Sequence, residues 1–312
     1  MRPIAEAYKD FPILHKEHNG HRVIYLDSGA TAQIPQSVID RVVEHMTQRN
    51  GNPHRGSHIL AIEASEDYEN ARDRVVEFIN AREREEVIFT RNSTESMNLI
   101  AHSYGLHNVK KGDKIVITVA EHHANLVTWQ YVAEQTGATL EYMYLDEHGH
   151  LKDGEINKID EKTKIVAFAH VSNVLGMEFP VKELTEKAHS VGAIVVLDGA
   201  QSTPHKKIDV QALDCDFFVF SGHKMCASQG IGVLYGKRDL LETMPPFLLG
   251  GDMIEYVKEQ TATFNELPYK FEAGTPNADG AVSLHAAIDY LESFGMDAIE
   301  AYEEELVAYI LP

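Results

Sequence analysis

Cysteine is scarce in this chain, which contains only Cys215 and Cys226 among its 312 residues. Neither belongs to a Cys-x-x-Cys pair, so the sequence argues against a zinc ribbon and against a redox-active dithiol. Two thiols in a chain of this length also argue against a scaffold held by disulfides. Such a low cysteine content is typical of a reducing compartment, and it predicts a cytoplasmic location.

Basic residues and long apolar runs are also in short supply. The chain has 28 lysines and arginines against 48 aspartates and glutamates, which gives a formal net charge of −20. Because phosphate contacts need clustered lysine and arginine, this balance argues against a nucleic-acid partner. The apolar runs fall well short of the ~20 residues of a membrane span. Residues 1–14, MRPIAEAYKDFPIL, lack the basic and apolar regions of a signal peptide.

Common nucleotide-binding motifs are missing as well. Gly230-x-Gly232 is followed by Tyr235 where a GxGxxG motif needs glycine. Gly236-Lys237 is followed by Arg238 rather than by serine or threonine. These departures disfavour a Rossmann dehydrogenase and a P-loop NTPase. The chain also has no internal repeat, flexible linker or low-complexity tract, which favours one domain over a string of modules.

Short apolar segments alternate with segments of helical periodicity, which is the pattern of parallel β-α units. Several apolar segments contain almost no polar residue, as expected for strands buried on both faces of a sheet. Tyr68, Ala71, Val75 and Phe78 share one helical face, and two further helices are expected at 124–135 and 181–190. The predicted fold is an α/β domain with a mainly parallel, seven-stranded sheet flanked by helices. The predicted strands are Val87–Thr90, Lys114–Val119, Leu140–Leu145, Ile165–Ala169, Ile194–Asp198, Phe217–Ser221 and Ile231–Tyr235.

Polar clusters follow three of these strands, at the edge where open α/β sheets bind ligands. Residues 91–95, Arg-Asn-Ser-Thr-Glu, lead into a helix and form either an anion cradle or an ordinary helix cap. Asp198 ends a buried strand and needs a cationic or hydrogen-bonding partner, unless it merely caps a helix. Lys224 follows an apolar strand closely, so desolvation could lower its pKa as Schiff-base chemistry requires. A reactive lysine, an acid and a phosphate cradle are together the parts that a pyridoxal-phosphate enzyme supplies.

Eight segments in the same order resemble the SUF-type, or group II, cysteine desulfurases, which are class V aminotransferases of fold type I. The resemblance runs from about Phe11 to the last residues. It implies an N-terminal segment at 1–20, a large cofactor-binding domain at 21–295 and the start of a small C-terminal domain at 296–312. The segments are YLDSGATAQ (25–33), NPHRGSH (52–58), FTRNSTESMNL (89–99), EHHAN (121–125), HVSNVLG (170–176), DGAQS (198–202), DCDFFVFSGHKM (214–225) and FEAGTPN (271–277).

The resemblance implies a role for each matching residue. Lys224 would bind pyridoxal 5'-phosphate covalently, Asp198 would pair with the ring nitrogen, and Gln201 would hydrogen-bond the phenolic oxygen. His122 would stack on the ring, and Asn173 would lie beside the cofactor and the substrate. Thr275 would reach the phosphate in a neighbouring subunit, which implies a homodimer. The residues that would hold the phosphate within one subunit are Ser93, Thr94, Ser221 and His223.

Several histidines are candidates for metal ligands, but the sequence argues against a metal site. The pair His122 and His123 has no evident third ligand, and adjacent residues rarely point the same way. His54 and His58 are four residues apart, but the intervening Gly56 makes a helix doubtful there. No metal is therefore predicted. In the resemblance, His54 and Arg55 belong to a segment near the mouth of the site.

The chain departs from the family pattern in two places. After Met225 it reads Cys-Ala-Ser-Gln-Gly, where the family has an aromatic or apolar residue followed by Gly-Pro-Thr-Gly. Cys226 in this loop is either a packing residue or a nucleophile, and packing is the favoured role. The chain also stops at Pro312, before the small domain that carries the catalytic cysteine in the family. The last helix, 296–311, is therefore expected to expose its apolar stripe.

The expected activity is that of a cysteine desulfurase, which converts L-cysteine into L-alanine and passes the sulfur to an acceptor protein of the SUF system for iron–sulfur cluster assembly. Impaired turnover is expected because the cysteine segment is absent. A close variant is a selenocysteine lyase-like activity. An alternative from a different functional class is that the chain is a non-catalytic, cofactor-binding remnant or an interaction protein. A third alternative is that it is a relative of the aminotransferases or epimerases.

Overall fold

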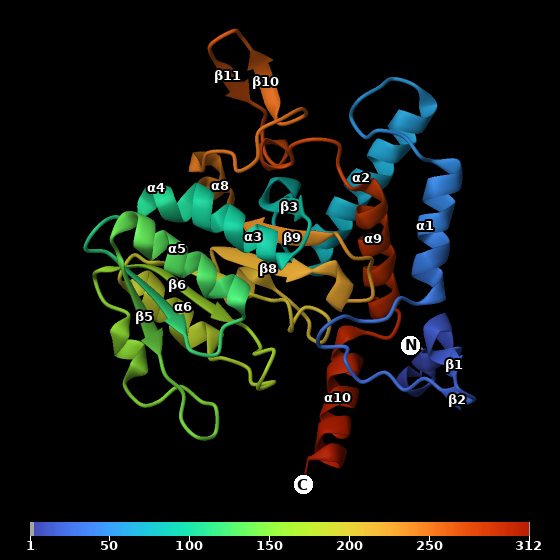
Figure 1. Ribbon diagram of the computed structural model, residues 1–312, viewed down its shortest axis with the longest axis horizontal. Coiled ribbons are helices and arrows are strands. Elements are labelled where there is room, and N and C mark those ends of the chain that lie inside the picture. The colour runs from blue at the N-terminus through green and yellow to red at the C-terminus, as the bar shows by residue number, and fades with distance from the viewer. Residues whose placement is uncertain (1–2, 312) are drawn as a thin grey trace.

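The computed structural model describes residues 3–311, and its centre is a seven-stranded sheet (Figure 1). The strands follow the order β3-β9-β8-β7-β6-β4-β5, and all pairs are parallel except those made by β9. The predicted α/β fold with a mainly parallel sheet is confirmed. The strands are β3 (Val87–Thr90), β4 (Lys114–Thr118), β5 (Thr139–Met143), β6 (Thr163–Ala169), β7 (Ile194–Asp198), β8 (Phe217–Ser221) and β9 (Gly232–Gly236).

Helices cover both faces of this sheet, because successive side chains of each strand point to opposite faces. On β7, Ile194 and Val196 face one apolar cluster, whereas Val195 and Leu197 face the other. Helices α3 and α5 pack on the first face, and α2, α6 and α9 pack on the second. The helices are α1 (Gln36–Gln48), α2 (Ile59–Phe78), α3 (Ser93–Ile100), α4 (Leu106–Asn108), α5 (Val127–Thr136), α6 (Val181–Ser190), α7 (Val210–Leu213), α8 (Arg238–Thr243), α9 (Ala278–Glu292) and α10 (Met296–Ile310).

Most predicted boundaries agree with the structure within two residues. The strands predicted at 87–90, 194–198 and 217–221 have the observed bounds. The helix predicted to begin at Ala124 begins at Val127, because His123–Asn125 form a 3-10 turn first. It ends where Gly137 adopts a left-handed conformation with φ 73°, which suits glycine. Strand β9 is antiparallel because residues 222–231 are too few for a crossover, which takes roughly a dozen residues or more.

Three segments extend from the sheet and its helices (Figure 1). The hairpins are β1 (Glu17–His18) with β2 (His21–Arg22) and β10 (Ile254–Val257) with β11 (Ala262–Phe264). Helix α10 runs to the C-terminal end with Leu306 and Ile310 exposed, as its predicted apolar stripe requires, while Ile299 is partly buried. None of the helices in residues 3–311 is both long enough and apolar enough to cross a bilayer.

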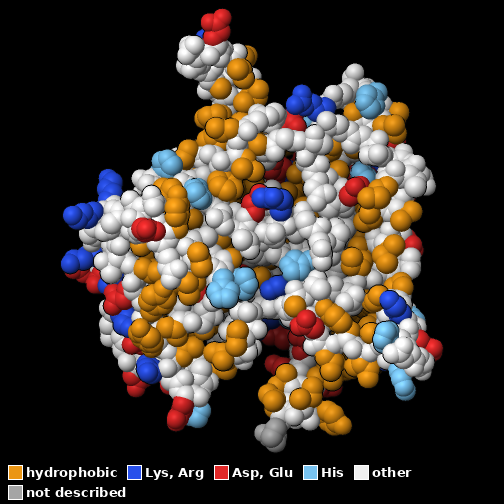
Figure 2. Space-filling view, viewed as in Figure 1, with side chains coloured by type: hydrophobic (Ala, Val, Ile, Leu, Met, Phe, Trp, Pro, Cys, Tyr) orange, Lys and Arg blue, Asp and Glu red, His pale blue; other side chains and the backbone are white. Residues whose placement is uncertain are grey.

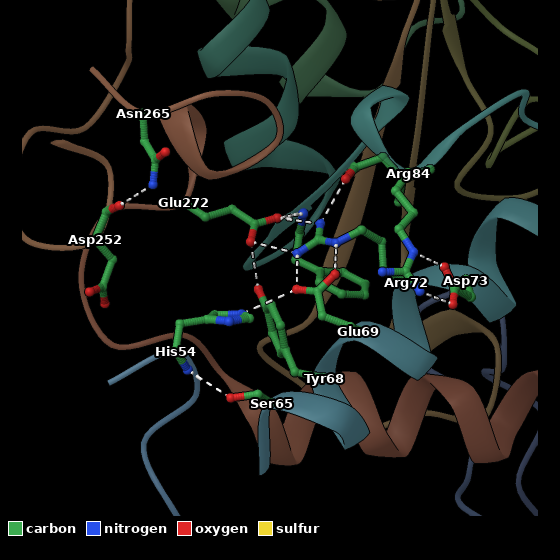
Figure 3. Close-up of polar contacts among 12 residues, drawn as sticks. His54, Ser65, Tyr68, Glu69, Arg72, Asp73, Arg84, Asp252, Asn265 and Glu272 are labelled. Carbon is green, nitrogen blue, oxygen red and sulfur yellow. Dashed lines mark hydrogen bonds and ion pairs between the residues drawn. The ribbon is translucent and has the colours of Figure 1, made fainter. Parts of the chain in front are cut away.

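A buried charge network joins α2 to β3 and to the segment that follows the β10–β11 hairpin (Figure 3). Arg72 on α2 is fully buried and forms two hydrogen bonds with Glu272, at 2.7 and 2.9 Å. Its Nε donates to Glu69 at 3.0 Å. Glu272 also accepts hydrogen bonds from the Tyr68 hydroxyl at 2.8 Å and from the backbone N–H of Phe89 at 2.7 Å. The network therefore ties 272–277 to the sheet at several points.

We predict that Glu272→Gln lowers the free energy of unfolding by about 3–5 kcal/mol, because it leaves the buried Arg72 charge without its full counter-charge. Urea titration followed by circular dichroism would measure the loss. Glu83→Gln is the matched control, since Glu83 pairs with Arg238 on the surface. It should cost about 1 kcal/mol or less. Equal losses in both variants would contradict a dominant role for the network.

Candidate functional site

A cavity of about 440 Å³ opens at the carboxyl ends of β6, β7 and β8. It contains every residue predicted for the site except Thr275. The lining residues are Gly29, Ala30, Asn92, Ser93, Thr94, His122, Ala124, Ala169, Val171, Asn173, Asp198, Ala200, Gln201, Ser221, His223 and Lys224. Residues that are distant in sequence therefore meet because parallel strands end at one edge of the sheet.

The beginning of α3 forms one wall of this cavity. Asn92 is the N-cap, and its side chain accepts a hydrogen bond from the backbone N–H of Glu95 at 3.0 Å. Ser93 and Ser221 meet through their hydroxyl oxygens at 2.7 Å, and the Ser93 N–H donates to the Ser221 hydroxyl at 2.9 Å. Hydroxyls and free N–H groups at a helix start favour a bound anion. Residues 91–95 thus contain a helix cap, and Asn92, Ser93 and Thr94 also line the cavity with groups suited to a phosphate.

Asp198 and Lys224 both line the cavity and interact electrostatically. Asp198 ends β7 and is buried, with its Oδ1 accepting the N–H of Ala200 at 2.9 Å. Burial raises the pKa of Asp198, although the Ala200 N–H and the nearby Lys224 oppose that shift. Burial lowers the pKa of Lys224, and the carboxylate of Asp198 opposes it. The amine is therefore easier to deprotonate than that of an exposed lysine.

His122 lies beside these two groups at the start of a 3-10 turn. Its Nδ1 accepts the N–H of Ala124 at 3.1 Å, which holds the imidazole against its own backbone. Burial lowers the pKa of His122, and Lys224 lowers it further, whereas Asp198 raises it. A neutral imidazole with a fixed orientation suits stacking against a flat ring.

The loop that carries Asn173 closes another side of the cavity. Val171 and Glu178 pair as an isolated bridge at its base. The hydroxyl of Ser172 accepts N–H groups from Val174 at 3.3 Å and Leu175 at 3.2 Å. These bonds fold the loop back on itself and leave Asn173 at the cavity wall.

A segment from the N-terminal part of the chain lies over one side of the cavity, and the sequence analysis assigned no role to it. Gly29 and Ala30 line the cavity, and the Gln201 amide donates to the Gly29 carbonyl at 2.9 Å. The Thr31 hydroxyl donates to the His223 carbonyl at 3.1 Å. The only signal for this segment is the motif YLDSGATAQ, which supported the resemblance without naming a contact.

Three other residues singled out in the sequence lie away from the cavity with Lys224. Thr275 lines a separate cavity of about 670 Å³, together with Arg91 and Glu272. His54 has a left-handed backbone with φ 61° and contacts Glu69 through Nε2 at 3.2 Å (Figure 3). Arg55 pairs with Asp252 at 2.7 Å. Within one chain these residues do not reach the predicted site.

The loop after Lys224 is held by packing of Cys226 and by a hydrogen bond from Ser228. Cys226 adopts a left-handed conformation with φ 68° and packs against the core, and burial raises the pKa of its thiol to about 12. Ser228 is tied to Ser283 of α9 through their hydroxyls at 2.7 Å. The packing role favoured for Cys226 agrees with this position.

The donor set of the cavity fits pyridoxal phosphate. An amine with a lowered pKa, a buried carboxylate, and a group of hydroxyls and N–H groups are chemically suited to the aldehyde, the ring nitrogen and the phosphate of that molecule, respectively. In residues 3–311, histidine, cysteine, aspartate and glutamate form no cluster of three that could hold a metal ion.

Comparisons with known proteins agree with this geometry. The family described as aminotransferase class-V matches residues 24–312. A probable cysteine desulfurase of Halalkalibacterium halodurans is 53% identical over 98% of this chain and 76% of its own length. Another of Synechocystis is 50% identical over 98% of this chain and 73% of its own length.

Solved structures give the same picture. The apo structure of a cysteine desulfurase from Thermococcus onnurineus has a TM-score of 0.93 and 41% identity, and the match covers 99% of this chain and 76% of that one. A cysteine desulfurase from Escherichia coli has a TM-score of 0.89 and 38% identity over the same shares of the two chains.

We predict that Gly199→Ala lowers the melting temperature and weakens the site, because a Cβ at Gly199 would lie 2.0 Å from the ring of Phe218 on β8. Overpacking of this kind costs about 1–3 kcal/mol and would push Asp198 and Ala200 away from β8. Gly250→Ala is the control, since its added Cβ meets nothing closer than 3.9 Å. Thermal unfolding of both variants would test this, and a Gly199 variant as stable as the control would refute it.

Proposed function

Because the chain belongs to the class-V aminotransferase family, we propose that it is a pyridoxal-phosphate-dependent cysteine desulfurase, which converts L-cysteine into L-alanine and releases the sulfur. The observation that carries this proposal is that Lys224 and Asp198 face one cavity. The relatives named above support the choice of substrate, since they are 50% identical or more over nearly the whole chain.

In this proposal each wall of the cavity would hold one part of pyridoxal phosphate. Lys224 would bind its aldehyde carbon, Asp198 would pair with its ring nitrogen, and His122 would lie against its ring. Gln201 would hydrogen-bond its phenolic oxygen, and Asn173 would lie beside the cofactor and the substrate. The bound cofactor supplies an electron sink for the carbon that carries the substrate's amino group. The groups assigned to the phosphate are those of Ser93, Thr94, Ser221 and His223.

The chain's own residues would then move one proton. With its lowered pKa, the Lys224 amine is suited to take the proton from the substrate's α-carbon and to return it later. Residues 29–31 bond to Gln201 and His223, which fixes the cavity wall beside the reactive lysine.

The sulfur has no thiol acceptor among the lining residues. Cys215 is fully buried, and burial raises the pKa of both Cys215 and Cys226 above the ordinary value for a thiol. Neither residue lines the cavity of Lys224. We therefore propose that these 312 residues turn over slowly alone and pass sulfur to an external thiol, which in the cell would be an acceptor protein of the SUF system. The lack of a thiol among the lining residues also favours a second candidate function, that of a cofactor-binding protein without turnover.

The proposal includes a homodimer. Apolar residues are exposed along α1 and the start of α2, including Val43, Met46 and Ile59, which is 64% exposed. Figure 2 shows such side chains along the flank formed by α1 and on the projecting β10–β11 hairpin. A second copy would cover this surface, and it would bring a partner to the separate cavity of Thr275. The cytoplasmic location stays a prediction from the sequence.

We predict that borohydride reduction in the presence of pyridoxal phosphate labels Lys224, which mass spectrometry of tryptic peptides would detect. Lys224→Arg should abolish this label and lower the production of alanine from L-cysteine by at least about 10²-fold. Lys270→Arg is the matched control, because burial also lowers the pKa of Lys270 although it lies outside the cavity. Labelling that persists in Lys224→Arg would refute the assignment.

The same assay separates the two candidate functions. If the chain is a desulfurase, alanine and sulfide should appear when dithiothreitol is present as the thiol, and Cys226→Ser should leave both unchanged. A labelled Lys224 without any alanine would favour the cofactor-binding protein. Loss of alanine in Cys226→Ser would contradict the packing role of Cys226.

We predict that light scattering after gel filtration gives about twice the chain mass of 34.9 kDa. Ile59→Asp should shift the protein toward a monomer, because it places a charge on the apolar surface of α2. Leu306→Asp is the control, since Leu306 is also exposed but lies on α10. A wild-type monomer, or a dimer lost only in the control, would refute the proposed interface.

A further inference from the structure

Glu121 is a buried acid directly behind the cavity, and the proposed reaction gives it no role. It follows β4 and precedes His122, and only 8% of its surface is exposed. Its Oε1 lies 2.5 Å from the hydroxyl of Thr118, and its Oε2 accepts the side-chain N–H of Asn125 at 2.6 Å. The backbone N–H of Ala169 is a third donor. None of these donors carries a positive charge.

A second carboxyl lies close to Glu121. Ala169, which donates to Glu121, is the residue of β6 that pairs with Asp198 of β7. Strand β6 lies between β4, which Glu121 follows, and β7, which Asp198 ends, so the two acids lie on either side of one strand and both adjoin Ala169. The nearby cation, Lys224, and the imidazole of His122 act on Asp198, which faces the cavity.

Two buried carboxylates this close are unfavourable when both are charged. Burial raises the pKa of Glu121 to about 8, and Asp198 raises it as well, although the bonds from Thr118 and Asn125 oppose the shift. Asp198 keeps its charge more readily than Glu121, because Lys224 favours the charged form of Asp198. Near neutral pH the proton therefore belongs on Glu121.

The contact with Thr118 suits both protonation states of Glu121. When Glu121 is neutral, its Oε1–H donates to the Thr118 hydroxyl oxygen, which also accepts the N–H of Ala120 at 3.2 Å. When Glu121 is charged, the Thr118 hydroxyl rotates and donates to the carboxylate instead. The proton can leave without stranding a buried polar atom.

We propose that Glu121 acts through Asp198 as a positioning residue of the cofactor site, carrying a proton in the free protein and releasing it to solvent when the cationic ring of pyridoxal phosphate binds against Asp198. The ring brings a positive charge that both carboxylates share, so the Oε–H bond of Glu121 breaks and its electron pair stays on the oxygen. This inference rests on the placement of the cofactor proposed above.

The release of a proton determines how the affinity for pyridoxal phosphate changes with pH. A proton released on binding makes the affinity rise with pH, by up to about tenfold per pH unit for one proton. The rise should continue up to pH near 8, where Glu121 of the free protein ionises, and then level off. Other groups also titrate in this range, including His122, Lys224 and the cofactor itself, so the measured quantity is the difference between wild type and a Glu121 variant.

Glu121→Gln is the informative variant, because a neutral amide can form the same hydrogen bonds as the neutral acid. Glu86→Gln is the matched control, since Glu86 is also buried but lies before β3, where it accepts the N–H of Arg82. Infrared spectroscopy of the cofactor-free protein at pH 7 should show a carboxylic-acid carbonyl band that is lost in Glu121→Gln and kept in Glu86→Gln.

The second measurement is the affinity for pyridoxal phosphate from pH 6 to 9. Relative to wild type, Glu121→Gln should show a smaller increase of affinity with pH below 8, whereas Glu86→Gln should follow wild type. A cofactor analogue with carbon in place of the ring nitrogen should remove the difference between wild type and Glu121→Gln.

Each outcome decides a separate point. Absence of the infrared band, or its persistence in Glu121→Gln, would overturn the inference without any cofactor being added. Parallel pH profiles for wild type and Glu121→Gln would also overturn it while leaving cofactor binding intact. Failure of the wild-type protein to bind pyridoxal phosphate would instead overturn the proposed function, and the infrared result would still decide whether Glu121 holds a proton.

Discussion

The parallel pairing of β6, β7 and β8 is the constraint on which the site depends. Strands that run the same way end at one edge, so Ala169, Asp198 and Ser221 meet there although they are far apart in sequence. Both faces of the sheet are covered, which keeps water away from the strand ends and makes each charged group sensitive to its neighbours. Burial raises the pKa of Asp198 and of Glu121, and it lowers the pKa of Lys224.

Segments outside the sheet complete the site that forms at the strand ends. The turn at residues 29–31 lies over one side of the cavity, and its bonds to Gln201 and His223 join it to the wall that carries the reactive lysine. On the other side, the Arg72–Glu272 contact anchors the segment that leads to Thr275. The bonds of residues 29–31 lie at the cavity itself. The Arg72–Glu272 contact instead helps to position Thr275, at a surface that a second copy of the chain is proposed to cover.

Most of the fold could be predicted from the sequence, because short stretches of residues are enough to identify the strands and helices. Strands such as 194–198 and 217–221 are apolar up to their last residues, Asp198 and Ser221, so both the strands and the cavity wall were predictable. The direction of β9 and the contact of Gly29 with Gln201 were not, because they depend on loop length and on packing between distant segments. Glu121 could not be found for another reason: its proposed role depends on its position across β6 from Asp198, which no local pattern reveals.

The turn at residues 29–31 also sets the order in which this chain can mature on the ribosome. At ~5–20 residues per second, translation needs about 10–40 s to add the 192 positions that separate Thr31 from His223. Throughout that interval the turn at 29–31 has no surface on which to dock. The cavity is therefore completed only after β8 has emerged from the ribosomal exit tunnel. A nascent chain that ends before β8 lacks a complete site for pyridoxal phosphate.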